Sequence, residues 1–319
     1  MAETTGDRIL VTGALGQIGT DLVEALRNRH GSDSVIASDV REVPGHPLLE
    51  SGPFRLLSVL DGDSMDSVVR EEEVGEIYHL AAILSAVGEK KPELCQRVNV
   101  GGTITVLEAA KEHGLRVFSP SSIAVFGPDT PRTAPQVTPL NPTTTYGLTK
   151  VTGEVMAMNY WKQYGVDVRG IRYPGLISWK SPPGGGTTDY AVEIFHAALN
   201  ERHYNCFVGP DTRLPMMYID DAIRGTMELM EAPIDSIGPS RGGYNFAGMS
   251  FTAGDLANAI SERVDGFTCD FKPDERQQYA DSWPDDVDDS TAREDWGWKA
   301  EYDLGRMTDE MLDRLSNQS

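Results

Sequence analysis

The chain has 319 residues, of which 39% are hydrophobic, and a formal net charge of −21. This length accommodates either one large nucleotide-binding domain with a smaller lobe or two modest domains. The acidic balance disfavours nucleic acid and anionic membranes as partners. There is no run of about 18 apolar residues that would predict a membrane-spanning helix, and residues 1–8 lack the pattern of a signal peptide. The cysteines are few and widely spaced, which favours a reducing, cytoplasmic location: Cys95, Cys206 and Cys269.

Two explanations account for the acidic composition. One is an ordinary acidic cytosolic protein, and the other is adaptation to salt, in which surface carboxylates keep a protein dissolved. The acidic residues are most concentrated near the C-terminus, at Asp281, Asp285, Asp286, Asp288 and Asp289. A series of activity and solubility measurements in KCl distinguishes the two explanations.

Short β-branched runs alternate with helical stretches in the first half of the chain. This pattern is typical of a parallel sheet covered by helices. In chain order, strands are predicted at residues 9–11, 35–39, 54–60, 76–80, 116–119 and 167–172, and helices at 17–28, 98–112 and 146–164. The predicted fold class is therefore α/β, with a doubly wound parallel sheet of the Rossmann type.

The sequence changes character after Tyr173. The proline- and glycine-rich stretch 182–186 predicts an irregular loop. Helices are predicted at 189–200 and 217–230, a strand at 243–246, and one further helix after residue 251. We predict a first domain over residues 1–175, with return segments at about 210–248, and a smaller C-terminal lobe over residues 176–319.

A glycine-rich turn separates the first predicted strand from the first predicted helix. Gly13, Gly16 and Gly19 form the pattern G-x-x-G-x-x-G, with Gln17 and Ile18 at the start of the helix. Glycines at these positions let the backbone turn tightly and approach a pyrophosphate, which binds at the helix N-terminus. Because the pattern follows a strand and opens a helix, it predicts that the first domain binds a dinucleotide.

Asp39 ends the second predicted strand. A carboxylate there accepts hydrogen bonds from the adenosine ribose and repels a 2′-phosphate, which predicts NAD rather than NADP. Arg41 weakens this prediction, because an arginine can accommodate that phosphate. Asp61, after the third strand, would either reach the adenine or remain a solvated acid. Leu80, Ala81 and Ala82 follow the fourth strand, where small residues allow the backbone to pass close to the cofactor.

Tyr146 and Lys150 stand four residues apart on the long predicted helix, and therefore share one of its faces. A nearby cation favours the phenolate and lowers the pKa of a tyrosine by roughly 1–3 units. A tyrosine tuned in this way is suited to removing a proton from an alcohol while hydride passes to a dinucleotide. Ser121 and Ser122 follow the fifth strand, at the edge where ligands bind, and one of these hydroxyls would hold the substrate oxygen.

This set of residues resembles the extended short-chain dehydrogenase/reductase family over nearly the whole chain. The resemblance implies that Tyr146 is the general acid/base, that Lys150 binds the nicotinamide ribose, and that Ser122 orients the reacting oxygen, with Ser121 as its close competitor. It also implies that Asn99 lies on the cofactor side. The histidines show no metal-ligand spacing with the cysteines, and no metal is predicted.

The segment from Tyr173 to Glu193 is similar to the signature of one subfamily, the short-chain-type L-threonine 3-dehydrogenases. The resemblance extends to Pro120–Ser121–Ser122–Ile123, to residues 214–218 and to residues 281–284. It implies NAD-dependent oxidation of L-threonine to 2-amino-3-oxobutanoate in a homodimer. The cofactor would also be contacted by Tyr173 and Pro174.

The resemblance places the substrate contacts mainly in the C-terminal lobe. We expect them at Ser85, Ser121, Tyr146, Gly186, Thr187, Thr188, Asp189 and Trp283. Asp189 would either face the substrate ammonium or cap the following helix. Trp283 would either cover the pocket or belong to the core. Residues 184–186 are predicted to form a lid that becomes ordered on ligand binding.

Two other functions remain open at this point. One is a nucleotide-sugar epimerase or dehydratase that retains its NAD, which predicts NAD that copurifies and no net NADH. The other is a non-catalytic redox sensor with a Rossmann domain. The segment 184–192 argues against the first, and the presence of both Tyr146 and Lys150 argues against the second.

Overall fold

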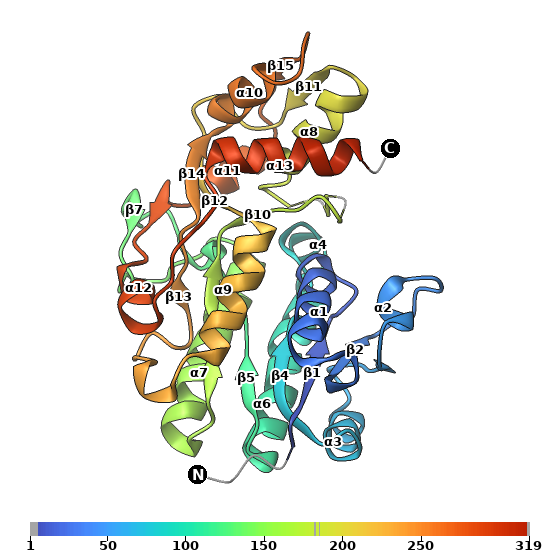
Figure 1. The fold of residues 1–319 in the computed structure, drawn as a ribbon. Coiled ribbons are helices and arrows are strands. Elements are labelled where there is room, and N and C mark those ends of the chain that lie inside the picture. The colour runs from blue at the N-terminus through green and yellow to red at the C-terminus, as the bar shows by residue number, and fades with distance from the viewer. Residues whose placement is uncertain (1–5, 182, 185, 318–319) are drawn as a thin grey trace.

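The computed structural model describes residues 6–181, 183–184 and 186–317. A parallel sheet with its helices forms the lower part of the molecule in Figure 1, and α8 (Tyr190–Asn200), α10 (Ala253–Ser261) and α13 (Leu304–Ser316) lie above the carboxyl ends of its strands. None of the described helices is both long enough and apolar enough to span a membrane.

The central sheet has six parallel strands in the order β3-β2-β1-β4-β5-β8. This is the strand order of a doubly wound, Rossmann-type sheet, in which ligands bind outside the carboxyl ends of the strands. The strands are β1 (Arg8–Thr12), β2 (Val35–Asp39), β3 (Phe54–Leu56), β4 (Val74–His79), β5 (Arg116–Phe118) and β8 (Val168–Arg169).

Alternate residues of β1 contribute to two different cores, because successive side chains of a strand point to opposite faces of the sheet. Leu10 packs with Ile36 and Ile77 on the face covered by α3, α6 and α7. Ile9 and Val11 belong to the core on the other face, under α1 and α9. These helices are α1 (Gln17–His30), α3 (Gly62–Glu71), α6 (Gly102–His113), α7 (Thr145–Tyr164) and α9 (Ile219–Glu231).

Shorter helices complete this part of the chain. They are α2 (Pro47–Glu50), α4 (Ser85–Lys90), α5 (Pro92–Gln96) and the π-helical turn Arg97–Gly101 that leads into α6. α4 and α5 both pack against α7, so the segment after β4 lies beside the long helix that carries Tyr146.

Three short parallel strands extend the sheet at its carboxyl edge, in the order β13-β9-β6. Gly170 lies between β8 and β9. A Cβ atom there would lie 2.6 Å from the Ser119 carbonyl oxygen and 2.7 Å from that of Gly242, so the close approach of these segments requires a glycine. The strand predicted at 167–172 is therefore divided in two. The three strands are β6 (Ser121–Ser122), β9 (Ile171–Tyr173) and β13 (Tyr244–Asn245).

The remaining strands form three small sheets above this edge. They are β10 (Gly175–Ile177), β12 (Arg213–Tyr218) and β14 (Met249–Thr252); β11 (His203–Cys206) and β15 (Thr268–Phe271); and β7 (Thr133–Ala134) and β16 (Asp286–Val287). Two short helices precede α13, namely α11 (Arg276–Asp281) and α12 (Ser290–Trp296).

The predicted α/β class with a doubly wound parallel sheet is confirmed, but three local predictions are wrong. The third strand ends at Leu56 instead of residue 60. Met217 and Tyr218 belong to β12 and not to the following helix, because they pair with Leu176 and Ile177 of β10. The chain after residue 251 contains α10, α11, α12 and α13 rather than one helix.

Candidate active site

The glycine-rich turn joins β1 to α1 and is packed against the end of β4. Gly13 has a φ of +69°, and a Cβ atom there would lie 2.6 Å from the backbone nitrogen of Ala81. A Cβ atom on Gly19 would lie 2.4 Å from the Gly13 carbonyl oxygen. Gly16 precedes the first residue of α1, whose first turn carries no acidic side chain. The helix N-terminus is therefore suited to an anionic pyrophosphate, and the turn fits the predicted dinucleotide.

Asp39 lies at the end of β2, beside this turn. Its Oδ2 atom accepts a hydrogen bond of 3.2 Å from the backbone nitrogen of Leu15. The carboxylate is partly buried and adjacent to the start of α1, which fits the ribose contact predicted for NAD.

Asp61 has a structural role as the residue that caps α3. Its carboxylate accepts hydrogen bonds from the backbone nitrogen and the hydroxyl of Ser64, at 3.0 and 2.7 Å. These hydrogen bonds lower the pKa of the exposed Asp61 carboxyl group. A contact between Asp61 and the adenine stays a prediction.

The loop after β4 is held by hydrogen bonds to the end of β1 and, through Asn99, to α7. Leu80 donates from its backbone nitrogen to the Thr12 carbonyl oxygen at 3.0 Å, and Ala81 and Ala82 follow it at the edge of the sheet. Asn99 is buried and accepts a hydrogen bond from the backbone nitrogen of Ile83 at 2.8 Å. Asn99 also donates to the Thr149 hydroxyl at 3.0 Å, so it fixes this loop against α7.

His79 is a packed histidine below this loop. Its Nδ1 atom lies 3.0 Å from the Thr12 hydroxyl, and burial lowers its pKa to about 3, with a smaller contribution from Lys150. It is therefore neutral at physiological pH.

Tyr146 and Lys150 lie on the first turns of α7. Thr144 caps this helix by accepting a hydrogen bond from the backbone nitrogen of Gly147 at 3.0 Å, and Gly165 ends it in the left-handed conformation. The Lys150 Nζ atom lies 5.6 Å from the centre of the Tyr146 ring and donates to the Pro120 carbonyl oxygen at 2.8 Å. The predicted pair is therefore assembled at the carboxyl edge of the sheet.

The expectation that Lys150 lowers the pKa of Tyr146 is wrong for the protein alone. Burial raises the pKa of Tyr146 to about 12, and a hydrogen bond with the Ser122 side chain opposes this rise. Burial lowers the pKa of Lys150 to about 8, against the opposing charges of Cys95 and Glu154. Both shifts share a cause, because a poorly solvated site penalises phenolate and ammonium alike.

The two candidate serines point to different partners. Ser122 faces Tyr146 and also accepts a hydrogen bond of 3.2 Å from the backbone nitrogen of Ala124. Ser121 is buried, and its hydroxyl donates to the Oε1 atom of Glu154 at 2.5 Å. The geometry favours Ser122 as the hydroxyl that meets the reacting oxygen.

Tyr173 ends β9, where it pairs with Ser122 of β6, and Pro174 follows it at the same edge of the sheet. The Tyr173 ring is buried, packs against Phe118 and Phe246, and hydrogen-bonds the Thr226 hydroxyl. Its side chain is thus held in the core. A cofactor contact of Tyr173 would therefore use its backbone, and the contact predicted for Pro174 stays a prediction.

The predicted substrate segment crosses from β10 to α8. Thr187 is buried, and a Cβ atom on Gly175 would lie 2.7 Å from the Thr188 methyl carbon. Asp189 precedes α8 but makes no side-chain cap; its Oδ2 atom accepts a hydrogen bond of 2.8 Å from the backbone nitrogen of Gly186. The cap expected as one alternative for Asp189 is therefore wrong. Pro182 and Gly185 lie outside the described residues, so the lid over 184–186 stays a prediction.

Two further predicted substrate contacts lie on other elements. Ser85 is the first residue of α4, and the adjacent Leu84 has its Cδ1 atom 4.0 Å from where a Cβ atom of Gly184 would be. The segment after β4 and the segment before α8 therefore approach each other. Trp283 is 8% exposed and packs in the main core, which agrees with the core alternative.

Two carboxylates of this region were missed in the sequence. Glu89 on α4 accepts a hydrogen bond from the backbone nitrogen of Tyr146, and no local pattern indicates this contact between distant segments. Glu154 lies on α7 and is 8% exposed. Glu154 is four residues from Lys150 and eight from Tyr146, which places all three on one helix face. This spacing in the sequence could have identified Glu154 as a residue of the site.

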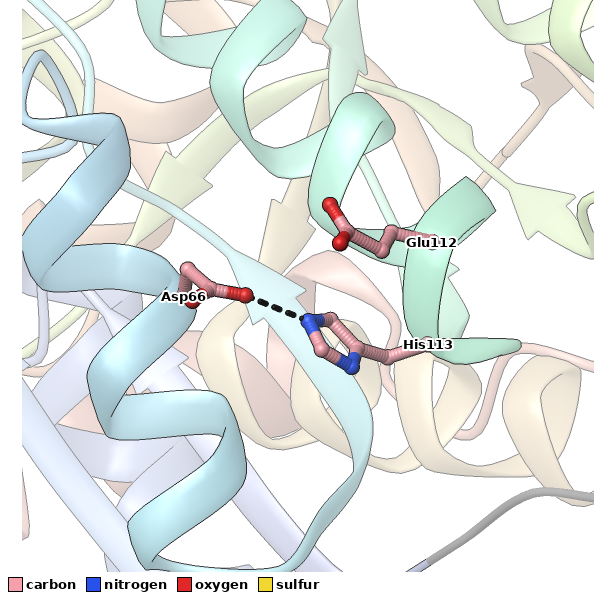
Figure 2. Close-up of side chains that lie close together, drawn as sticks. All are labelled: Asp66, Glu112 and His113. Atoms are coloured by element: carbon pink, nitrogen blue, oxygen red, sulfur yellow. Dashed lines mark hydrogen bonds and ion pairs between the residues drawn. The ribbon is translucent and has the colours of Figure 1, made fainter.

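A separate group of possible metal ligands lies between α3 and α6. The ligand atoms of Asp66, Glu112 and His113 are within 4.8 Å of one another. Figure 2 shows Asp66 pointing at His113, whose Nε2 atom is 2.7 Å from the Asp66 Oδ1 atom. The second Asp66 oxygen pairs with Arg70 at 2.7 Å. His113 ends α6 just before β5 begins, so this group lies at the opposite edge of the sheet from Tyr146.

The chain belongs to the NAD dependent epimerase/dehydratase family, whose model matches residues 9–242. Among its relatives is the mitochondrial L-threonine 3-dehydrogenase of Bos taurus, which is 46% identical over 100% of this chain and 85% of that protein. The resemblance to the extended short-chain dehydrogenase/reductase family and the predicted NAD cofactor are both confirmed.

Two solved structures share nearly the whole fold. One is a GalE-like L-threonine dehydrogenase from Cupriavidus necator in its holo form, with 51% identity and a TM-score of 0.93 over 97% of this chain and 99% of that one. The other is a monomeric L-threonine 3-dehydrogenase from a metagenome in its apo form, with the same identity, TM-score and coverage.

Proposed function

We propose that this chain oxidises the 3-hydroxyl group of L-threonine with NAD+ to give 2-amino-3-oxobutanoate and NADH. The observation that carries this proposal is the juxtaposition of Tyr146, Ser122 and Lys150 at the carboxyl edge of a dinucleotide-binding sheet. Threonine as the substrate is supported by relatives of that activity that match the chain over almost its full length.

Each residue of this trio has a separate part in the reaction. Tyr146 takes the proton of the substrate 3-hydroxyl as the C3–H bond breaks, and the Ser122 hydroxyl donates a hydrogen bond to the same oxygen. Lys150 holds the nicotinamide ribose, and its hydrogen bond to the Pro120 carbonyl oxygen fixes its amine beside Tyr146. When bound, NAD+ accepts the hydride released from C3.

The remaining predicted residues hold the two ligands. Gly13, Gly16 and Gly19 receive the pyrophosphate, and Asp39 receives the adenosine ribose. Residues 186–189 and Ser85 form the polar contacts with the amino acid, whose small size suits a pocket made of a few hydroxyls and amides. The division at about residue 175 into a cofactor domain and a substrate lobe, with return segments at about 210–248, is part of this proposal.

We further propose that the protein is a cytoplasmic homodimer joined through α6 and α7. These neighbouring helices expose Ile104, Leu148 and Val155, with 43, 53 and 63% of their surfaces accessible. Exposed apolar side chains on adjacent helices favour association with a second copy. Light scattering of the protein and of Leu148→Asp/Val155→Asp tests this: a mass of one chain for the unaltered protein would contradict the dimer, as for the monomeric metagenomic relative.

The function is tested by adding NAD+ and L-threonine and following absorbance at the NADH band. Tyr146→Phe is expected to lower turnover by about 10³-fold or more and to leave NAD+ binding unchanged. Tyr164→Phe, at the exposed end of the same helix, is the matched control and should retain activity. Near-normal turnover by Tyr146→Phe would contradict the mechanism.

The same assay separates the two alternative functions. NAD that copurifies, together with no net NADH, would indicate a nucleotide-sugar epimerase or dehydratase. Binding of NAD without turnover of any substrate would indicate a redox sensor. A signal with another 3-hydroxy acid, but none with threonine, would keep the reaction class and change the substrate.

A further inference from the structure

A buried carboxylate lies one helical turn below Lys150 and is held by two charged or polar partners. Glu154 is 8% exposed, and Arg172 is 6% exposed. The guanidinium donates from Nε to Oε1 at 2.9 Å and from Nη2 to Oε2 at 2.8 Å, which is a bidentate pair. Ser121 donates a third hydrogen bond to Oε1 at 2.5 Å. The Glu154 carboxylate is therefore fixed in one position.

This carboxylate connects the three segments that carry the reacting groups. Glu154 shares a face of α7 with Tyr146 and Lys150. Ser121 precedes Ser122 on β6, and Arg172 lies on β9 just before the segment that leads to the substrate contacts. One rigid group thus sets the position of α7 relative to β6 and β9.

A small cavity of about 20 Å³ has both Lys150 and Glu154 in its lining. Its other polar lining includes His79, Asn99 and Ser121. A polar cavity of this size is sufficient for one water molecule. Lys150 and Glu154 therefore border the same cavity, which also has polar lining from other residues.

The chain segment that passes beside Glu154 carries two glycines, Gly242 and Gly243, at the points of closest approach. A Cβ atom on Gly243 would lie 2.5 Å from the Glu154 carboxyl carbon, and one on Gly242 would lie 3.0 Å from the Glu154 carbonyl oxygen. The segment before β13 can therefore pass beside Glu154 only because it carries two glycines.

We propose that Glu154 is a positioning residue, whose negative charge keeps the Lys150 amine protonated and whose hydrogen bond to Ser121 fixes the strand that carries Ser122. Within the described residues, the charged and titratable groups around Lys150 are Tyr146 and Glu154 on α7, Glu89 on α4, His79 on β4, Cys95 on α5 and Arg172 on β9. His79 is neutral at physiological pH, and the Cys95 thiol has a pKa raised chiefly by burial. Of the two carboxylates, Glu89 accepts a hydrogen bond from the backbone nitrogen of Tyr146, whereas Glu154 lies four residues from Lys150 on the same helix face and favours its ammonium form.

The charge is tested by a measurement that needs no turnover. Brief labelling with acetic anhydride over a pH series, followed by mass spectrometry, gives the pH at which each lysine becomes reactive. Lys162, exposed on the same helix, is the internal reference. Glu154→Gln is expected to move the midpoint of Lys150 labelling down by roughly one pH unit and to leave that of Lys162 unchanged.

A second variant keeps this test decisive if the first one does not fold. Glu154→Gln leaves Arg172 buried without its ionic partner, which destabilises a protein strongly. Glu154→Gln/Arg172→Gln removes both charges, and the loss of the Arg172 cation opposes the loss of the carboxylate. Because Glu154, unlike Arg172, lines the cavity that Lys150 also lines, the Lys150 midpoint should still fall, but by less than in Glu154→Gln. An unchanged or raised midpoint in either folded variant overturns the electrostatic part of the proposal.

The positioning part is tested by Ser121→Ala, which removes a hydrogen bond to Glu154 and retains its charge. This variant should keep the labelling midpoint of Lys150 and lower kcat for threonine oxidation several-fold, and an unchanged kcat overturns this part. Only this measurement of kcat rests on the proposed function; the labelling of Lys150 does not. A shifted midpoint in a protein that makes no NADH from threonine would refute the proposed function and support the electrostatic role of Glu154.

Discussion

The Oε1 atom of Glu89 accepts a hydrogen bond from the backbone nitrogen of Tyr146 over 3.1 Å. Glu89 lies on α4, the helix that begins with Ser85, so one side chain links a predicted substrate contact to the predicted base. A carboxylate in the first turn of α7 also interacts favourably with the positive end of the helix dipole. The bond therefore couples the position of α4 to the start of the catalytic helix.

Removing this carboxylate should affect catalysis and stability together. Glu89→Ala is expected to lower kcat/KM for threonine about tenfold, because the start of α7 loses a fixed partner. The free energy of unfolding should fall by about 1 kcal/mol, measured by urea denaturation. Glu93→Ala, an exposed carboxylate on α5, is the control and should change neither quantity. Equal kcat/KM in the two variants would argue against the coupling.

The two adjacent serines should differ sharply when replaced. Ser122→Ala is expected to lower kcat by about 10²-fold, because one donor to the reacting oxygen is lost. Ser121→Ala should lower kcat less and reduce the free energy of unfolding by about 1–3 kcal/mol, because Glu154 loses a buried donor. Steady-state kinetics and urea denaturation of both variants check this. The reverse order of the two kcat values would assign the catalytic hydroxyl to Ser121.

His79 should make the protein less stable in acid. Its pKa is lowered from 6.5 to about 3 in the folded chain. Between these values the unfolded chain binds the proton and the folded chain does not, so stability falls as the pH decreases from about 6.5 toward about 3. His79→Gln should show a smaller loss of unfolding free energy between pH 7 and pH 5 than the unaltered protein. His30→Gln, at an exposed position, should show the full loss.

The net charge of −21 predicts a response to salt. If the carboxylates adapt the protein to salt, activity and solubility should be maintained or should rise as KCl is added, because salt screens their mutual repulsion. Threonine oxidation and the soluble fraction are measured over the same KCl series. A steady loss of activity from low salt upward would identify an ordinary acidic protein.

The parts of the molecule governed by local patterns were predictable from the sequence. The glycine turn lies between a predicted strand and a predicted helix, and this context was enough to predict its position at the edge of the sheet. The spacing of Tyr146 and Lys150 on one helix was sufficient to bring them together. Family resemblance then supplied the substrate, which no periodicity in the chain indicates.

Other parts depend on contacts between distant segments. Adjacent residues of a strand point to opposite faces, so Ser121 and Ser122 had to differ, but their assignment required the position of Glu154. Met217 is compatible with a helix or a strand from its sequence alone, and its pairing with Leu176 of β10 places it in β12. The direction of the pKa shift of Tyr146 depends on burial, which a sequence does not specify.

The pair Gly242 and Gly243 has a consequence for protein engineering. Replacing loop glycines by alanine is a common way to raise thermal tolerance, because it limits the freedom of the unfolded chain. Gly62 offers open space for such a methyl group. At position 243 the same methyl group would displace Glu154 and, with it, the support of Lys150. A stabilisation campaign on this enzyme should therefore exclude these two positions, although neither is among the predicted ligand contacts.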